Sequence, residues 1–260
     1  MLVDSHCHLD FPDFAAERDA IVARARVEGV GRMVTISTRV EKFADIEKIA
    51  AAYDDVFCSV GTHPHHADKE PDVTTADLVK LASSPKVVAI GEAGLDYFRN
   101  NSSREGQERG FRRHIAAARE TGLPLVIHAR DADEDIARIL EEESVKGSFP
   151  FVLHCFTGGA DLAARGVALG GYVSFSGVIT FKKSDALRDI AANLPADRIL
   201  VETDAPFLAP EPFRGKRNEP ALVAHTAKAL ADARKTDFET IKQQTTGNFF
   251  RLFSKVPAAA

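Results

Sequence analysis

The segment Val3-Asp4-Ser5-His6-Cys7-His8-Leu9-Asp10 decides how the rest of the chain is interpreted. Leu2-Val3 is typical of the start of a β-strand, in which alternate side chains share a face. His6 and His8 are therefore expected to point in the same direction, with Cys7 on the opposite face. Two imidazoles at a strand end supply half of a site for a divalent metal, but an ordinary polar strand end is equally compatible with them. The metal hypothesis therefore needs further ligands at equivalent places in the chain.

Size and composition set the broad class. With 260 residues and 45% hydrophobic residues, the chain has enough apolar material for one large domain or two small ones. No leader-like segment and no long uncharged apolar run are present, so we expect a cytoplasmic protein with no membrane partner. Three cysteines without paired spacing predict reduced thiols and no structural zinc clip. A net charge of -5 argues that any nucleic acid is bound locally and not over a broadly basic surface.

Eight short apolar runs alternate with amphipathic segments along the chain. The predicted strands begin at Leu2-Val3 and continue at 32–37, 56–61, 87–90, 125–127, 151–153, 172–175 and 199–201. The predicted helices are 14–28, 40–53, 75–82, 103–121, 131–143, 161–169, 184–192, 220–233 and 237–250. Ser102 and Glu105 have the spacing of a capping box at the start of helix 103–121, and Gly122 marks its end.

This alternation predicts a parallel sheet covered by helices, and eight repeats favour closure into a TIM-type (β/α)₈ barrel. No linker interrupts the pattern, so the prediction is one α/β domain over residues 1–256, followed by a tail at 257–260. The alternative is an open doubly wound sheet. The absence of a glycine-rich fingerprint after the first strand makes that alternative weaker.

Histidines and carboxylates gather where the predicted strands end. Of nine histidines, seven follow a predicted strand, whereas His114 and His225 fall inside predicted helices and are assigned to packing or surface. In a barrel the carboxyl ends of the strands share one rim, which is where catalytic residues lie. The expected ligands are His6, His8, Glu92, His128, His154 and Asp204. Because this set is too large for one tetrahedral ion, we predict two divalent ions, with Glu92 between them.

Six segments in chain order resemble the TatD family of metal-dependent deoxyribonucleases, in the amidohydrolase superfamily. They are Asp4-Ser5-His6-Cys7-His8-Leu9-Asp10, Gly61-Thr62-His63-Pro64-His65, Gly91-Glu92-Ala93-Gly94-Leu95-Asp96-Tyr97, Ile127-His128-Ala129-Arg130-Asp131-Ala132, Leu153-His154-Cys155-Phe156-Thr157-Gly158 and Glu202-Thr203-Asp204-Ala205-Pro206. The resemblance implies a TIM-type barrel with a pair of magnesium, manganese or zinc ions. It also implies hydrolysis of DNA phosphodiester bonds, often from the 3′ end.

The resemblance assigns roles to individual residues. One ion would be held by His6, His8, Glu92 and Asp204, and the other by Glu92, His128 and His154. Asp204 would also act as the general base on the attacking water. His63 would lie near the scissile phosphate, where it orients the phosphate or protonates the leaving oxygen. His65 would lie next to the metal ligands and contact the substrate.

Two arginines are candidates for contact with the substrate. Arg130 follows His128 by two residues, so its guanidinium is placed to bind a phosphate oxygen, although a salt bridge is nearly as compatible. Arg214 lies in the basic loop 212–219, which either cradles a phosphate or is simply a solvated loop.

Residues next to the proposed ligands have more modest expected roles. Glu202 is expected to form hydrogen bonds inside the site, and Asp96 to lie on a loop beside Glu92. Asp4 either orients the neighbouring histidines or shapes the strand-end turn. The cysteines next to His6 and His154, Cys7 and Cys155, are expected to face outward under the helices as small apolar groups.

Three functions follow from these residues. The first is a metal-dependent phosphodiesterase acting on the ends of DNA, for which the family resemblance implies a 3′-5′ exonuclease. The second keeps the metal centre but changes the bond, as in an aminoacyl-tRNA deacylase. The third is a binding protein without catalysis, which would require missing ligands, and none is missing.

Overall fold

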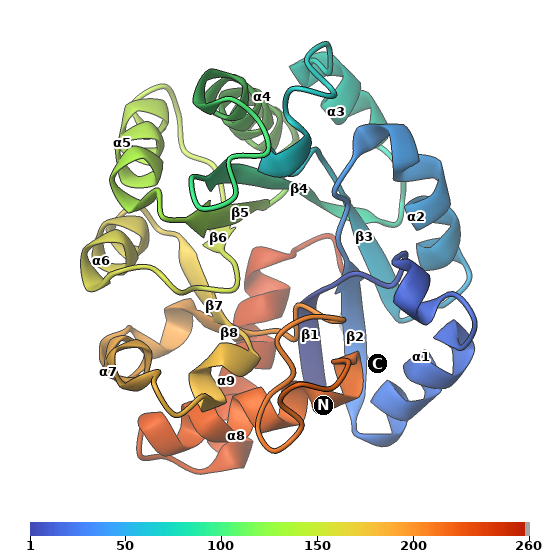
Figure 1. The fold of residues 1–260 in the computed structure, drawn as a ribbon, viewed down its shortest axis with the longest axis vertical. Coiled ribbons are helices and arrows are strands. Elements are labelled where there is room, and N and C mark those ends of the chain that lie inside the picture. Colours follow the sequence, from blue (N-terminus) through green and yellow to red (C-terminus); the bar gives the residue numbers. More distant parts are fainter. Residues whose placement is uncertain (258–260) are drawn as a thin grey trace.

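Eight parallel strands pair in chain order in the computed structural model, which describes residues 1–257. They are β1 (Leu2–Cys7), β2 (Val30–Thr35), β3 (Val56–Val60), β4 (Val87–Asp96), β5 (Leu125–Arg130), β6 (Phe151–Leu153), β7 (Tyr172–Phe175) and β8 (Ile199–Val201). Residues 258–260 of the predicted tail lie outside the described part of the chain. Figure 1 shows the strands arranged around a centre, with helices outside them.

The sheet closes between its last and first strands through segments that also belong to the site. The Asp204 amide donates to the His6 carbonyl at 2.9 Å, and the His8 amide donates to the Ala205 carbonyl at 2.8 Å. Below them, the Ser5 hydroxyl donates to the Val201 carbonyl at 3.0 Å. The predicted (β/α)₈ barrel is therefore confirmed, and the doubly wound alternative is wrong.

Helices surround the barrel in the predicted order. They are α1 (Arg18–Val27), α2 (Phe43–Ala51), α3 (Thr75–Leu81), α4 (Arg104–Thr121), α5 (Asp133–Ser144), α6 (Ala160–Ala168), α7 (Asp185–Asn193), α8 (Val223–Ala233) and α9 (Phe238–Leu252). Helix α1 starts four residues later than expected because Pro12–Phe14 forms a 3₁₀ turn that buries Phe14. Within residues 1–257, no helix is both long enough and apolar enough to cross a bilayer.

Helix α4 begins with a different cap from the one predicted. The Ser103 hydroxyl, and not that of Ser102, accepts the amide of Gly106 at 3.1 Å. Asp68 accepts the Ser103 amide at 2.6 Å and so ties the connection before the helix to the one after β3. The predicted end at Gly122 is confirmed, because this residue has the left-handed φ of 69° that glycine adopts without steric cost.

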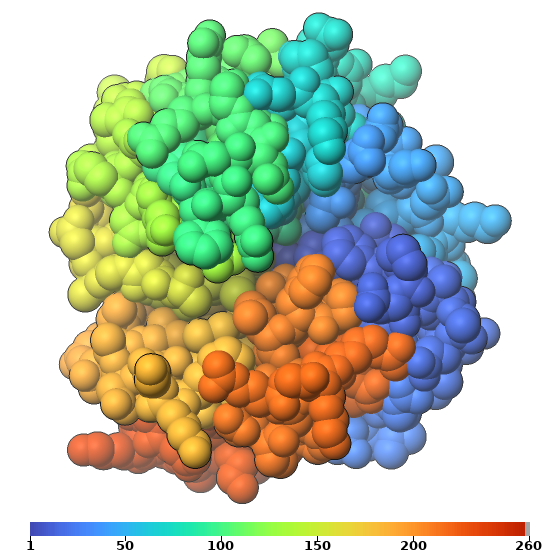
Figure 2. All heavy atoms as spheres, in the orientation of Figure 1, coloured from blue at the N-terminus to red at the C-terminus, as the bar shows by residue number. Residues whose placement is uncertain are grey.

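Apolar side chains close one end of the barrel. Val3, Phe57 and Leu200 belong to a buried cluster that also contains Phe249 and Phe253 of the C-terminal segment. The two phenylalanine rings stack with their centroids 4.6 Å apart. The histidines and carboxylates of the candidate site gather at the opposite end, where the strands finish. Figure 2 shows a hollow on that face, bordered by blue N-terminal, green and orange segments.

Candidate metal centre

Glu92 lies at the middle of the site because the backbone of β4 is irregular there. The register between β4 and β5 shifts between Ile90 and Ala93, and such a bulge redirects the side chains around it. Gly91 has φ of +112°, and a Cβ on Gly61 would come within 2.5 Å of its Cα. Only glycines allow the strands to approach this closely. The result is a carboxylate that is 2% exposed in the barrel mouth.

Four histidines from separate segments surround that carboxylate. Its Oε1 atom is 2.8 Å from His154 Nε2, 2.9 Å from His128 Nδ1 and 3.3 Å from His63 Nε2. Its Oε2 atom is 3.4 Å from His6 Nε2. The sequence places these residues up to 148 positions apart, so the convergence is produced by the barrel.

Asp204 completes the site on the side of β1. Its Oδ1 atom is 3.4 Å from His8 Nε2 and 3.5 Å from His6 Nε2, and the two Nε2 atoms are 3.3 Å apart. His8 Nδ1 donates to the Ile36 carbonyl at 3.1 Å, which turns Nε2 toward the carboxylates. His6 and His8 therefore point in the same direction, as the strand period predicted.

The charges of the site compensate one another. Burial opposes ionisation of Glu92, but the charge of His154 and the hydrogen bonds from His128 and His154 outweigh it and hold the pKa of this carboxyl well below its usual value. Burial also opposes protonation of His154, yet Glu92 and Glu202 raise its pKa well above the ordinary value. For His63, burial prevails and lowers the pKa to about 3. Buried carboxylates thus demand positive charge here, which either a proton or a cation can supply.

The donor set fits a divalent metal. Three groups each bring ligand atoms within 4.8 Å of one another: His6, His8 and Glu92; His63, Glu92 and His128; and His6, His154 and Glu202. Imidazole nitrogens and carboxylate oxygens suit zinc, manganese and similar ions. The grouping differs in detail from the expected sets, because His63 joins Glu92 and His128 while His154 also pairs with Glu202.

Asp96 is a site residue that the sequence analysis underestimated. It ends β4, is 1% exposed, and its Oδ2 atom contacts His65 Nε2 at 2.7 Å and His128 Nε2 at 3.0 Å. The expectation that it lies on a loop is wrong because β4 continues beyond the bulge and pairs with β5 up to Arg130. Its spacing of four residues from Glu92, two strand periods, was the available signal.

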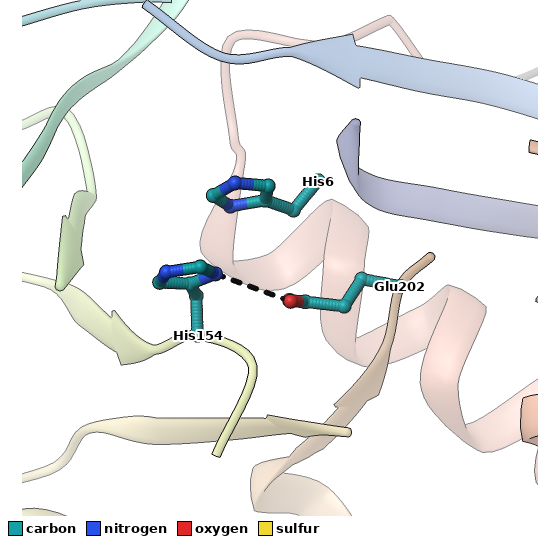
Figure 3. Close-up of side chains that lie close together, drawn as sticks. All are labelled: His6, His154 and Glu202. Carbon is teal, nitrogen blue, oxygen red and sulfur yellow. Dashed lines mark hydrogen bonds and ion pairs between the residues drawn. The ribbon is translucent and has the colours of Figure 1, made fainter. Parts of the chain in front are cut away.

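Glu202 forms hydrogen bonds inside the site, as predicted. Its Oε1 atom accepts from His154 Nδ1 at 3.1 Å and from the Cys155 amide at 2.8 Å, as Figure 3 illustrates for the histidine. The His154 ring lies parallel to that of His6, with centroids 3.9 Å apart. Because Nδ1 faces Glu202, the Nε2 atom of His154 is directed to Glu92. Glu202 thus fixes which nitrogen is offered to the centre.

Replacing Glu202 is expected to weaken metal binding. Glu202→Ala removes the acceptor that orients His154, and we expect the affinity for Mn²⁺ or Zn²⁺ to fall roughly 10- to 100-fold. Glu202→Gln keeps an acceptor oxygen and should lose less. Competition with a fluorescent chelator measures both constants. Equal affinities of wild type and the alanine variant would contradict the role assigned to Glu202.

The two cysteines have different surroundings. Cys7 lies in the core beneath the helices, and its thiol donates to the Val34 carbonyl at 3.5 Å, as expected. The expectation for Cys155 is wrong. Its φ of 41° turns the chain directly after β6, and its Sγ atom lies 3.1 Å from the Ser176 hydroxyl at the site's edge.

Other predicted contacts are placed around this centre. The His65 Nε2 atom lies 2.7 Å from Asp96 Oδ2, and the His65 backbone amide donates to His63 Nδ1 at 3.0 Å. Asp4 accepts the amide and the hydroxyl of Thr203 at 2.9 and 2.6 Å, so it fixes the β8 end next to β1. Arg130 and Arg214 are exposed and lie over aromatic rings, at 4.2 Å from Phe98 and 4.3 Å from Phe181 respectively.

His114 supports the loop that carries His63 and lies outside the centre. Its Nε2 atom accepts the Thr62 amide at 3.0 Å, and its Nδ1 donates to the Gly110 carbonyl at 2.7 Å. Burial lowers the pKa of His114 to about 4. Because the folded-state pKa lies below the unfolded value of 6.5, stability is lost as the pH falls from 6.5 toward 4.

Urea unfolding can test this contribution. Between pH 7 and pH 5, His114 is expected to remove about 2 kcal/mol from the free energy of unfolding. A His114→Gln variant cannot take up the proton, so its stability should fall by about 2 kcal/mol less over the same interval. If both proteins lose the same free energy, His114 does not contribute to the acid sensitivity.

A barrel that gathers histidines and carboxylates around a buried glutamate at its strand ends defines a metal-dependent hydrolase. The family model for TatD related DNase matches residues 3–254. The chain therefore belongs to the TatD family. Its relatives include the metal-dependent hydrolase YcfH of Escherichia coli K12, which is uncharacterized and 41% identical over 97% of this chain and 95% of its own length. The uncharacterized metal-dependent hydrolase YabD of Bacillus subtilis is 39% identical over 97% and 99%.

Two further relatives bear on the activity and the fold. The 3′-5′ ssDNA/RNA exonuclease TatD of Escherichia fergusonii is 36% identical over 97% of this chain and 98% of its own. The crystal structure of YJJV, a TatD homolog from Escherichia coli K12, superposes with a TM-score of 0.91 and 32% identity over 98% of both chains. The protein is thus an enzyme, as its relatives YcfH and YabD, both named metal-dependent hydrolases, indicate.

Proposed function

We propose that the protein hydrolyses phosphodiester bonds at the ends of single-stranded DNA, in the 3′-5′ direction, with two divalent ions. The observation that carries this proposal is Glu92, whose two carboxylate oxygens face separate groups of histidines. A carboxylate shared in this way is the arrangement expected between two metal ions. The 36% identity to a 3′-5′ ssDNA/RNA exonuclease supports the choice of bond and substrate.

Each ion has a proposed set of ligands. His6, His8, Glu92 and Asp204 would hold one ion, and Glu92, His128 and His154 would hold the other. When bound, the ions supply Lewis-acid activation of a water molecule and of the phosphate. Magnesium, manganese and zinc are the candidates.

The protein's own groups supply positioning and proton transfer. Asp204 is 14% exposed at the mouth and takes the proton of the attacking water. His63 lies 3.3 Å from Glu92 and faces the phosphate, which it orients while the leaving oxygen departs. Asp96 orients His65 and His128 through hydrogen bonds with the Nε2 atom of each ring. Arg130 and Arg214, together with His65, contact the substrate outside the centre.

A direct assay tests this function. The purified protein is incubated with 5′-labelled single-stranded DNA and, separately, with magnesium, manganese or zinc. The expected result is a ladder that shortens from the 3′ end and disappears with a chelator. Aminoacyl-tRNA under the same conditions tests the deacylase alternative. Release of the amino acid without any shortening of DNA would overturn the proposal.

A further inference from the structure

Four arginines near the mouth of the barrel have unused hydrogen-bond donors. Within residues 1–257, the guanidinium groups of Arg99, Arg104, Arg130 and Arg214 take part in no hydrogen bond or ion pair, and all four side chains are exposed. Each lies instead over an aromatic ring. The distances to the ring centroids are 5.5 Å for Arg99 and 4.2 Å for Arg130, both over Phe98, 3.9 Å for Arg104 over Tyr97, and 4.3 Å for Arg214 over Phe181.

Arginines on the outer helices behave differently. Arg112 pairs with Glu108, Glu142 and Glu143 at 2.5 to 2.8 Å. Arg165 is paired in the same way with Glu141 at 2.7 Å. Arg112 and Arg165 are thus neutralised by glutamates, and so is Arg217 after β8, which pairs with Glu17 at 2.6 Å. Arg99, Arg104, Arg130 and Arg214 lack such partners among the described residues. This explains how a chain with net charge -5 can still present cations near its active site.

Phe98 and the two arginines over it lie at or just after the ends of strands that carry residues of the metal centre. Phe98 is 54% exposed and follows β4, the strand that carries Glu92 and Asp96. Arg130 ends β5 two residues after His128, which is about 6.6 Å along an extended strand. His128 itself contacts both carboxylates of β4. Arg99 and Arg130 therefore follow residues of the centre closely in the chain, Arg99 three residues after Asp96 and Arg130 two residues after His128.

The stacking prepares these groups to bind an anion. A guanidinium attracted to the face of a ring loses side-chain freedom, while its N–H groups stay free to bind phosphate oxygens. The arginine side chains are therefore partly ordered before the ligand binds, which reduces the conformational entropy that binding costs. In a nucleic-acid substrate, the anion next to the cleaved phosphodiester is the neighbouring backbone phosphate.

We propose that Phe98, Arg99 and Arg130, here called the Phe98 bracket, bind the phosphate next to the one held at the metal centre. The inference rests on the proposed function and specifies its substrate as a strand of several nucleotides, as opposed to a compound with a single phosphodiester. Phe98 positions the two arginines, and the arginines make the contacts.

The number of phosphate contacts can be obtained from the salt dependence of the binding constant. Fluorescence anisotropy with the metal-loaded protein and a labelled 12-nucleotide single strand whose phosphorothioate linkages resist cleavage, at 50 to 300 mM salt, gives the slope of log K against log salt. Each lost phosphate contact reduces the slope for a single strand by about 0.7. The Arg99→Ala/Arg130→Ala variant is expected to lose about 1.4 and to bind roughly tenfold more weakly per arginine at 50 mM salt.

Two further variants separate the bracket from a general charge effect. Lys48→Ala/Lys228→Ala removes two exposed cations from helices α2 and α8 and should keep the wild-type slope. Phe98→Leu keeps an apolar side chain but removes the aromatic face, so affinity should fall several-fold. The KM for the 12-nucleotide strand should rise more in the double arginine variant than the KM for thymidine 5′-(p-nitrophenyl phosphate).

The outcomes distinguish the two proposals. If the wild type shortens DNA but the double arginine variant retains the wild-type slope, the bracket is wrong and the proposed function remains. An equal loss in the lysine control would also overturn the bracket, because the effect would then be one of net charge. A wild type that neither binds nor shortens the strand removes the proposed function and the bracket together.

Discussion

Glu92→Gln is expected to lose hydrolysis and bound metal together. The substitution keeps the size of the side chain but removes the negative charge that four imidazoles face at 2.8 to 3.4 Å. The pKa of Glu92 is held well below its usual value, so the wild-type carboxylate is charged at neutral pH. We expect kcat/KM on labelled single-stranded DNA to fall at least roughly 10³-fold.

Metal content is the second measurement for this variant. Because Glu92 faces both groups of histidines, its loss should reduce the metal retained after gel filtration at both places. Glu105→Gln, at a glutamate whose side chain is 91% exposed on α4, is the matched control and should behave as wild type. Wild-type activity in the Glu92→Gln enzyme would remove Glu92 from the proposed chemistry.

Asp204→Asn should separate metal binding from proton transfer. Asp204 has φ of +57°, a conformation that asparagine tolerates better than most residues, so the backbone should be retained. Burial opposes ionisation of Asp204, but His8 and His6 outweigh it and lower its pKa. We expect kcat to fall about 10²- to 10³-fold, because the general base is lost.

The metal content of this variant should differ from that of Glu92→Gln. The group formed by Glu92, His128 and His154 does not include Asp204, so at least one ion should remain bound. Titration with Mn²⁺, followed by its paramagnetic resonance signal, measures the remaining stoichiometry. Complete loss of metal would show that Asp204 holds the whole centre together. Unchanged kcat would exclude it as the base.

The convergence of His6, Glu92, His154 and Asp204 was predictable because it depends on one rule. Each residue follows an apolar run, and a parallel barrel brings the ends of all its strands to one rim. Motif order added the family resemblance, which the match over residues 3–254 confirmed. Local sequence patterns were thus enough to predict both the barrel and the rim on which the site lies.

Asp96 and Cys155 were not predictable in the same way. The strand β4 looks finished at Ile90 in the sequence, and only pairing with β5 extends it to Asp96. Cys155 depends on a positive φ that a non-glycine residue adopts for tertiary reasons. The stacking of Arg130 on Phe98 joins two connections whose distance no local pattern encodes.

The seam between β8 and β1 has a consequence for synthesis of the chain. The backbone hydrogen bond from Asp204 to His6 joins residues 198 positions apart, and it also sets the two side chains side by side. A growing polypeptide released only as far as β8 carries most of the imidazoles but not this partner. We therefore expect a nascent or prematurely ended chain that lacks Asp204 to be without hydrolase activity, because the site is complete only when β8 and the segment after it join β1.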